Sequence, residues 1–163
     1  MFAKLIITLL ICGPVVAMAD WESTLFPKDF QTESNLTKAT ATATLHKKHV
    51  IVYATRTNCP PCDVLRSRLR RDDVAKPYRE SYVFTAVWNS SMGYSEREDY
   101  RRKYDVQGAP TWIVFKNTGQ YLCTARGAFF SDEDGLKLHQ AIQAQLASTE
   151  GSPTSGPRSC MTS

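Results

Sequence analysis

The chain has 163 residues, a formal net charge of +4, 42% hydrophobic residues and 22% charged residues. This length suits one domain, and the ordinary composition excludes a collagen, a coiled coil and a wholly disordered chain. The chain has 5 cysteines, too few for a fold held mainly by disulfides, so hydrophobic burial must supply the core. No basic stripe with aromatic platforms stands out, which argues against nucleic acid as a partner.

The first predicted segment is a secretory signal peptide over residues 1–19. One lysine precedes an almost unbroken apolar run from Leu5 to Val16, and Ala17-Met18-Ala19 supplies small residues for cleavage. The run is short for a membrane span, which takes about 20 apolar residues, and an uncleaved anchor is the alternative. We expect cleavage after Ala19 and export, to the bacterial periplasm, where disulfides persist.

Residues 20–44 are predicted to form an N-terminal extension that runs into the start of a helix. This extension is too short to be a second domain. A helix is expected over residues 34–47, capped by Ser34 or Asn35. Its rough apolar face consists of Leu36, Ala39, Ala43 and Leu45. Three aromatic residues of the extension are expected to pack on the domain: Trp21, Phe26 and Phe30.

Residues 45–147 predict one α/β domain in which strands and helices alternate. Short runs rich in β-branched and aromatic residues predict strands at 49–55, 82–88, 111–116 and 121–126. Helices are expected at 60–71, from Asp72 to a stop near Pro77, at 95–104 with Ser95 as its cap, and at 132–147. Helical connections between the early strands predict parallel pairing, and the late tight turn predicts an antiparallel edge.

Residues 148–163 are rich in Ser, Thr, Gly and Pro and cannot bury enough apolar surface to offset the entropy of ordering. We expect a disordered tail that carries Cys160. Cys123 falls in the fourth predicted strand, where a small buried residue is the first interpretation and a disulfide with Cys160 the second. Cys160 could also join two chains or stay a free thiol; a monomer is expected.

The sequence Cys59-Pro60-Pro61-Cys62 follows a predicted strand and opens a predicted helix. This spacing brings both sulfurs within the reach of a disulfide. The start of a helix favours the reactive thiolate at the first cysteine, and prolines suit the first helical turn. We therefore expect Cys59 to be the exposed nucleophile and the less exposed Cys62 to be the resolving thiol in disulfide exchange.

Two other interpretations of the cysteine pair stay open. The pair could be a static disulfide, although a bridge across so short a loop would stabilise the fold little. It could also join His46 and His49 in a zinc site. These histidines fall at a helix-to-strand junction, however, where they complement the C-terminal end of the helix. We expect no metal and no bound cofactor.

Together with the cysteine pair, the run KYDVQGAPT at residues 103–111 resembles the segment before the third core strand of the thioredoxin superfamily. The resemblance covers residues 45–147 and implies a thioredoxin fold, with a mixed sheet of about four strands flanked by helices. It also implies that a cis peptide bond precedes Pro110 and that this proline faces the cysteines. The residues expected to contact an extended substrate are Pro60, Pro61, Ala109, Pro110 and Thr111.

Two positions depart from the habit of this family. Asn58 stands where a tryptophan often precedes the first cysteine, and Tyr53 stands where many members carry a buried acid. Deprotonation of Cys62 would then depend on water or on another group. The reduction potential and the rate therefore cannot be transferred from the family.

The predicted function is that of an exported thiol–disulfide oxidoreductase acting on protein or peptide thiols and disulfides. A reductase or isomerase served by a membrane electron donor or acceptor is favoured over an oxidase, because the helical insertion frequent in oxidases of this fold is absent. The alternative is a thioredoxin-like binding subunit of an envelope or secretion assembly. In that alternative Cys59 and Cys62 form a structural pair.

Overall fold

The computed structural model describes residues 25–88, 92–127, 131–148 and 156–161. The expected signal peptide and Trp21 lie outside these residues, so cleavage after Ala19 stays a prediction. Within the described part of the chain, none of the helices has the length and apolar character needed to cross a membrane.

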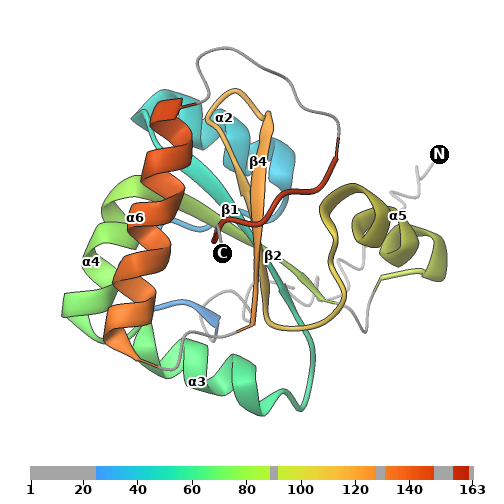
Figure 1. The fold of residues 1–163 in the computed structure, drawn as a ribbon, viewed down its shortest axis with the longest axis horizontal. Coiled ribbons are helices and arrows are strands. Elements are labelled where there is room, and N and C mark those ends of the chain that lie inside the picture. Colours follow the sequence, from blue (N-terminus) through green and yellow to red (C-terminus); the bar gives the residue numbers. More distant parts are fainter. Residues whose placement is uncertain (1–24, 89–91, 128–130, 149–155, 162–163) are drawn as a thin grey trace, which may run out of the picture.

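Four strands form one mixed sheet in the order β2-β1-β3-β4 (Figure 1). Strand β1 pairs in parallel with β2, whereas β3 runs antiparallel to both β1 and β4. The strands are β1 (His49–Thr55), β2 (Tyr82–Trp88), β3 (Thr111–Phe115) and β4 (Tyr121–Arg126). Each boundary lies within one residue of its predicted position, because polar turns bound short runs of strand-forming residues. The expected mixed sheet is confirmed.

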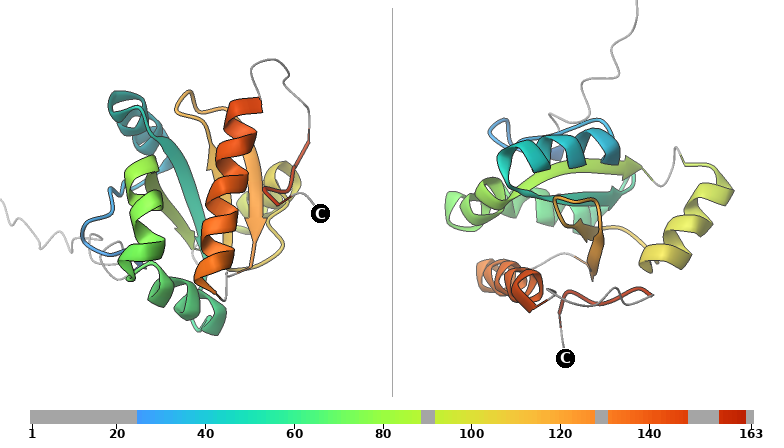
Figure 2. Two further views of the ribbon diagram at one scale, coloured as in Figure 1. Left: turned by 60° about the vertical axis from the view of Figure 1, so that its left-hand side comes forward. Right: turned by 90° about the horizontal axis from the view of Figure 1, so that it is seen from above.

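Helices cover both faces of this sheet, as Figure 2 shows from two further directions. The helices are α2 (Leu36–His46), α3 (Pro60–Arg68), α4 (Asp72–Ser81), α5 (Tyr94–Tyr104) and α6 (Asp132–Ser148). Helix α2 packs on one face, with the partly buried Tyr100 and Tyr104 of α5 joining the same apolar cluster. Helices α3, α4 and α6 pack on the other face.

The alternation of side chains along β1 divides the core between the two faces. Val50 and Val52 belong to the cluster under α2, whereas Ile51 and Tyr53 belong to the larger cluster on the opposite face. This division follows from the two-residue period of a strand, which sends neighbouring side chains to opposite faces. A strand buried on both faces therefore reads as the unbroken apolar run that predicted it.

The ends of α2 agree only in part with the sequence prediction. Asn35 caps the helix as expected, and its side-chain oxygen accepts a hydrogen bond of 3.0 Å from the Lys38 N–H. Leu45, expected on the apolar face, is instead 78% exposed. Leu45 lies two residues beyond the buried Ala43, and two helical steps turn a side chain by about 200°, to the opposite side of the helix.

Three other helix predictions are wrong in detail. Helix α3 ends at Arg68 and does not reach residue 71. Helix α4 does not stop near Pro77 but continues to Ser81. The proline removes one backbone N–H, and the burial of Val74 and Tyr78 elsewhere on the helix outweighs that loss. Helix α5 starts one residue earlier than expected, with Gly93 and not Ser95 at the cap position, and none of the described side chains caps it.

Segments from outside the predicted domain, residues 45–147, pair with both edge strands of the sheet. At the β2 edge, Phe84 N donates to Gln31 O and Glu33 N donates to Phe84 O, each at 2.8 Å. At the β4 edge, Thr124 N donates to Arg158 O at 2.7 Å, and Cys160 N donates to Thr124 O at 3.0 Å. Unpaired edges invite association with other chains, so both segments protect the sheet.

The C-terminal segment at the β4 edge corrects two expectations. Residues 156–161 are ordered against β4, although the whole tail from residue 148 was expected to be disordered. Cys123 and Cys160 form a disulfide with a Cα–Cα distance of 5.0 Å, so Cys123 is not a free core residue. Both cysteines are fully buried. Backbone pairing along β4 is what brings them together, and composition alone could not show it.

Candidate redox site

The cysteine pair occupies the turn between β1 and α3. Asn58 adopts a left-handed backbone with φ of 53°, a conformation that asparagine tolerates better than most residues. Cys59 follows at the cap position, where its Sγ accepts the Cys62 N–H at 3.3 Å. Pro60 and Pro61 are exposed in the first turn of α3, where their missing N–H groups leave no helical bond unmade.

Cys59 and Cys62 form a disulfide with a Cα–Cα distance of 5.2 Å. Cys59 is 3% exposed and Cys62 is 1% exposed. Cys62 is the less exposed of the two cysteines, as predicted, but the prediction of an exposed Cys59 is wrong. Cys59 belongs to the large core cluster, and Ala109 packs against that cluster from a distant part of the sequence. This packing accounts for the low exposure of Cys59.

The loop before β3 lies directly against the cysteine pair. The peptide bond between Ala109 and Pro110 is cis, and the Ala109 carbonyl oxygen lies 3.7 Å from Cys59 Sγ. In the disulfide this sulfur carries no proton, so the approach is a contact and becomes a possible hydrogen bond only for the reduced thiol. The loop is held by Thr111 Oγ1, which donates to Gly108 O at 2.7 Å.

The five residues expected to contact a substrate differ in their surroundings. The two prolines of α3 are exposed, Ala109 is partly buried and Pro110 is buried. Thr111 is only 1% exposed and its hydroxyl is bonded within the loop, so its side chain holds the loop in shape. A direct contact of these five residues with a substrate stays a prediction.

The zinc interpretation is not supported by the arrangement of its four residues. His49 opens β1 and Cys59 follows the end of that strand. A seven-residue strand separates its ends by about 20 Å, far beyond a shared coordination sphere. Among the residues that the structure describes, no group of three or more His, Cys, Asp or Glu side chains could hold a metal ion.

Tyr53 lies in the same core cluster as the two cysteines. It is fully buried, and its hydroxyl has no hydrogen-bond partner among the described residues. The Thr55 side chain lies nearby and acts to lower the pKa of Tyr53, but less strongly than burial acts to raise it. Burial raises the pKa of Tyr53, because the charged phenolate would be desolvated. The buried polar side chains in the described part of the chain are all threonines, so no described carboxyl takes the place of the missing acid.

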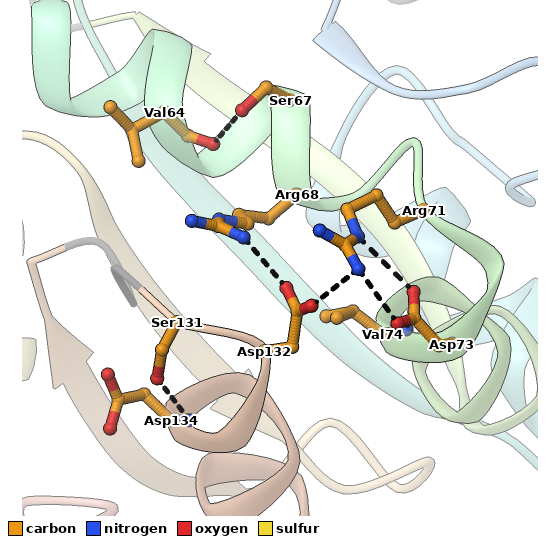
Figure 3. A network of polar contacts seen from close by, with 9 residues as sticks. All are labelled: Val64, Ser67, Arg68, Arg71, Asp73, Val74, Ser131, Asp132 and Asp134. Atoms are coloured by element: carbon orange, nitrogen blue, oxygen red, sulfur yellow. Dashed lines mark hydrogen bonds and ion pairs between the residues drawn. The ribbon is translucent and has the colours of Figure 1, made fainter.

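A network of ion pairs that no local sequence pattern predicts joins the far end of α3 to α6 (Figure 3). Arg68 Nη1 lies 2.9 Å from Asp132 Oδ1, and Arg71 Nη2 lies 2.7 Å from Asp132 Oδ2. Arg71 also contacts Asp73 at 3.1 Å. The arginines of α3 repeat like a solvent-exposed face, and their partner follows more than 60 positions later, so no local pattern could reveal the pairing.

A mixed sheet of this strand order, with a cysteine pair opening the helix after its central strand, is the fold of thioredoxin-like disulfide oxidoreductases. The chain belongs to the family of the thioredoxin-like domain, since residues 36–142 match it. The matched residues begin at 36, earlier than the predicted domain start at 45, and so include α2, which packs on the sheet. No curated protein is similar enough to the chain to count as a match.

Solved structures show the same fold at low sequence identity. A thioredoxin from Thermus thermophilus is 20% identical with a TM-score of 0.59, over 72% of this chain and 89% of that chain. A candidate disulphide isomerase from Bacteroides thetaiotaomicron is 22% identical with a TM-score of 0.56, over 75% of this chain and 94% of that chain. At such identities the likeness establishes the fold alone.

Proposed function

We propose that the protein is an exported thiol–disulfide oxidoreductase that exchanges disulfides with protein or peptide clients through Cys59 and Cys62. The observation that carries the proposal is the position of Cys59. Its sulfur caps α3, accepts the Cys62 N–H at 3.3 Å and lies 3.7 Å from the Ala109 carbonyl of the opposite loop. A helix N-terminus and a backbone N–H both stabilise a thiolate, which is the attacking species.

In the reducing direction, the Cys59 thiolate attacks one sulfur of a client disulfide. A new bond forms between Cys59 and that sulfur, the client disulfide breaks, and the other client sulfur leaves as a thiolate. The Cys62 thiolate then attacks Cys59, which releases the second client thiolate and forms the Cys59–Cys62 disulfide. Two electrons pass from the cysteine pair to the client, and two protons end on the client thiols at neutral pH.

Between turnovers the cysteine pair must be reduced again by an outside dithiol. We propose a membrane electron donor for this step and a reductase or isomerase role for the protein. Helix α4 is the one helix between α3 and β2, a stretch that the structure describes throughout. The lack of a helical insertion in this stretch supports the preference, since such an insertion is frequent in oxidases of this fold. Export is supported by the signal sequence and by the second disulfide, Cys123–Cys160.

Trapping of a client tests the proposal. Reduced Cys62→Ser protein is mixed with a disulfide-containing peptide, the reaction is quenched with acid, and the adduct is measured by intact mass and mapped by digestion. We expect a stable mixed disulfide at Cys59, because no second thiol can release it. The double variant Cys59→Ser, Cys62→Ser is the matched control and should give no adduct at residue 59. Absence of any adduct in Cys62→Ser would favour the binding-subunit alternative.

The direction of electron flow is tested by the reduction potential of the pair. Protein equilibrated with thiol buffers is alkylated and the fraction of reduced Cys59 and Cys62 is read by mass. A potential near about −270 mV, as in thioredoxin, would support a reductase. A potential near about −120 mV would make the protein an oxidant and would overturn the proposed direction.

A further inference from the structure

A small cavity of about 60 Å³ lies beside the loop that faces the cysteine pair. It is bounded by the ends of β1 and β2, by α5 and by the loop before Pro110. The residues that matter to its chemistry are Ala54, Val87, Met92, Arg97, Tyr100 and Ala109.

Ala109 places this cavity next to the reacting sulfur. The residue lines the cavity, and its carbonyl oxygen lies 3.7 Å from Cys59 Sγ. Residues next to a client sulfur that reaches Cys59 would therefore lie within a few residues' length of the cavity. Successive residues of an extended chain advance by about 3.3 Å, so a side chain one or two positions from the client cysteine can reach it.

The cavity combines an apolar wall with one cationic side chain. Ala54 and Val87 are largely or partly buried and present carbon atoms. Arg97 is exposed at the cavity, and no carboxylate among the described residues pairs with it. The next arginine of the helix, Arg101, is instead paired with Glu98 at 3.7 Å. An uncompensated guanidinium beside an apolar wall suits a short side chain that ends in a carboxylate.

The start of α5 also favours a carboxylate at the cavity. Gly93 occupies the cap position and no side chain in the described part of the chain caps the helix, so the first-turn N–H groups and the helix dipole favour an anion nearby. Met92, which precedes the cap, lines the cavity. Glu96 opposes this preference, since its charge is one of the influences that raise the pKa of Tyr100, but Glu96 does not line the cavity.

We propose that this cavity is a specificity subsite that accepts an aspartate or glutamate side chain next to the reacting cysteine of a client. The inference rests on the proposed function, because the subsite acts only on clients that react with Cys59. Arg97 is its specificity-determining residue. The carboxylate would meet the guanidinium of Arg97, and its methylene groups would lie against Ala54 and Val87.

Three peptides test the subsite, each with one internal disulfide and with Glu, Gln or Lys beside the first cysteine. The reduced protein is mixed with each peptide at low salt, and the rate of disulfide transfer is measured in single turnovers. We expect the Glu peptide to react about threefold to tenfold faster than the Gln peptide, as for a partly exposed charge-assisted contact. The Lys peptide should be the slowest. The preference should shrink in 1 M salt, where the Debye length is about 3 Å.

The variant Arg97→Gln should abolish the preference, so that the Glu peptide and the Gln peptide react at equal rates on this variant. Arg101→Gln, one turn further along the same helix and outside the cavity, is the matched control and should keep the full preference. Glu96→Gln should widen the preference, because it removes an opposing charge that acts on the cavity residue Tyr100. The ratio of two peptides on one variant cancels any general change in the reactivity of Cys59.

The possible outcomes separate the subsite from the function on which it rests. Equal rates for the Glu and Gln peptides in the unaltered protein would overturn the subsite and leave the oxidoreductase intact. A preference that survives in Arg97→Gln would also overturn it. If none of the three peptides exchanges its disulfide with Cys59, the proposed function fails and the subsite falls with it.

Discussion

Arg68 Nη1 lies 2.9 Å from Asp132 Oδ1 and joins the last residue of α3 to the first residue of α6 (Figure 3). Both side chains are partly buried, at 29% and 28% exposure, so water screens this pair less than a fully exposed one. Arg71, just beyond the end of α3, binds the other oxygen of Asp132. The helix that begins with the cysteine pair is therefore held at its far end by α6.

Removing the carboxylate of Asp132 should weaken the attachment of α3 to α6. We expect Asp132→Asn to lower the free energy of unfolding by about 1 kcal/mol, near the upper end for partly exposed ion pairs, because two arginines lose their charged partner. Urea unfolding followed by tryptophan fluorescence measures the change. Glu133→Gln is the control, since Glu133 makes an exposed pair with Lys137 one turn along α6. Equal losses in the two variants would mean that the network contributes no more than an ordinary surface pair.

The strands and the cysteine pair could be predicted because their signals are local. A run such as His49–Thr55 carries its own strand pattern, and the Cys-x-x-Cys spacing and the prolines lie within four residues. The features that were missed, or given only as a second interpretation, depend on distant contacts. Cys59 is buried because Ala109 covers it from fifty positions away, and Cys123 meets Cys160 only through backbone pairing at the β4 edge. Spacing and composition carry no information about such contacts.

Two buried tyrosines should respond in opposite ways to the same substitution. Tyr53 buries a hydroxyl that lacks a hydrogen-bond partner among the described residues, whereas Tyr78 donates to Gly135 O at 2.6 Å. We expect Tyr53→Phe to leave the free energy of unfolding unchanged or to raise it by up to about 1 kcal/mol. Tyr78→Phe should lower it by about 1–2 kcal/mol, because the bond between α4 and α6 is lost. Urea unfolding of both variants would contradict this account if Tyr53→Phe were the more destabilising.

Two partly buried histidines should make the fold less stable in mild acid. Burial lowers the pKa of His49 and of His139 below 6.5, with the charge of Lys116 as a second cause for His49. The unfolded chain therefore binds these protons more readily than the folded chain. The two neutral histidines contribute fully to stability above the pKa that they have in the unfolded chain. This contribution is lost as the pH falls from that value through their lower pKa in the folded chain.

The urea midpoint of the unaltered protein is accordingly expected to fall between about pH 7.5 and pH 5.5, a window that lies above the usual titration of carboxylates. The double variant His49→Gln, His139→Gln should show a clearly flatter dependence. His46→Gln is the control, because His46 is exposed at the end of α2. A slope that is the same in the double variant and the control would show that other groups cause the pH dependence.

The disulfide between Cys123 and Cys160 should stabilise the fold without taking part in catalysis. It closes a loop with a sequence separation of 37 residues, for which chain entropy predicts a contribution of about 3–4 kcal/mol. We expect the double variant Cys123→Ser, Cys160→Ser to lose most of this stability in thermal and urea unfolding. The potential of the Cys59–Cys62 pair should not change, because Cys123 and Cys160 lie at the β4 edge and Cys59 and Cys62 open α3. A shifted potential in a variant that is still folded at the temperature of the assay would contradict this separation of roles and would make the second disulfide part of the redox site.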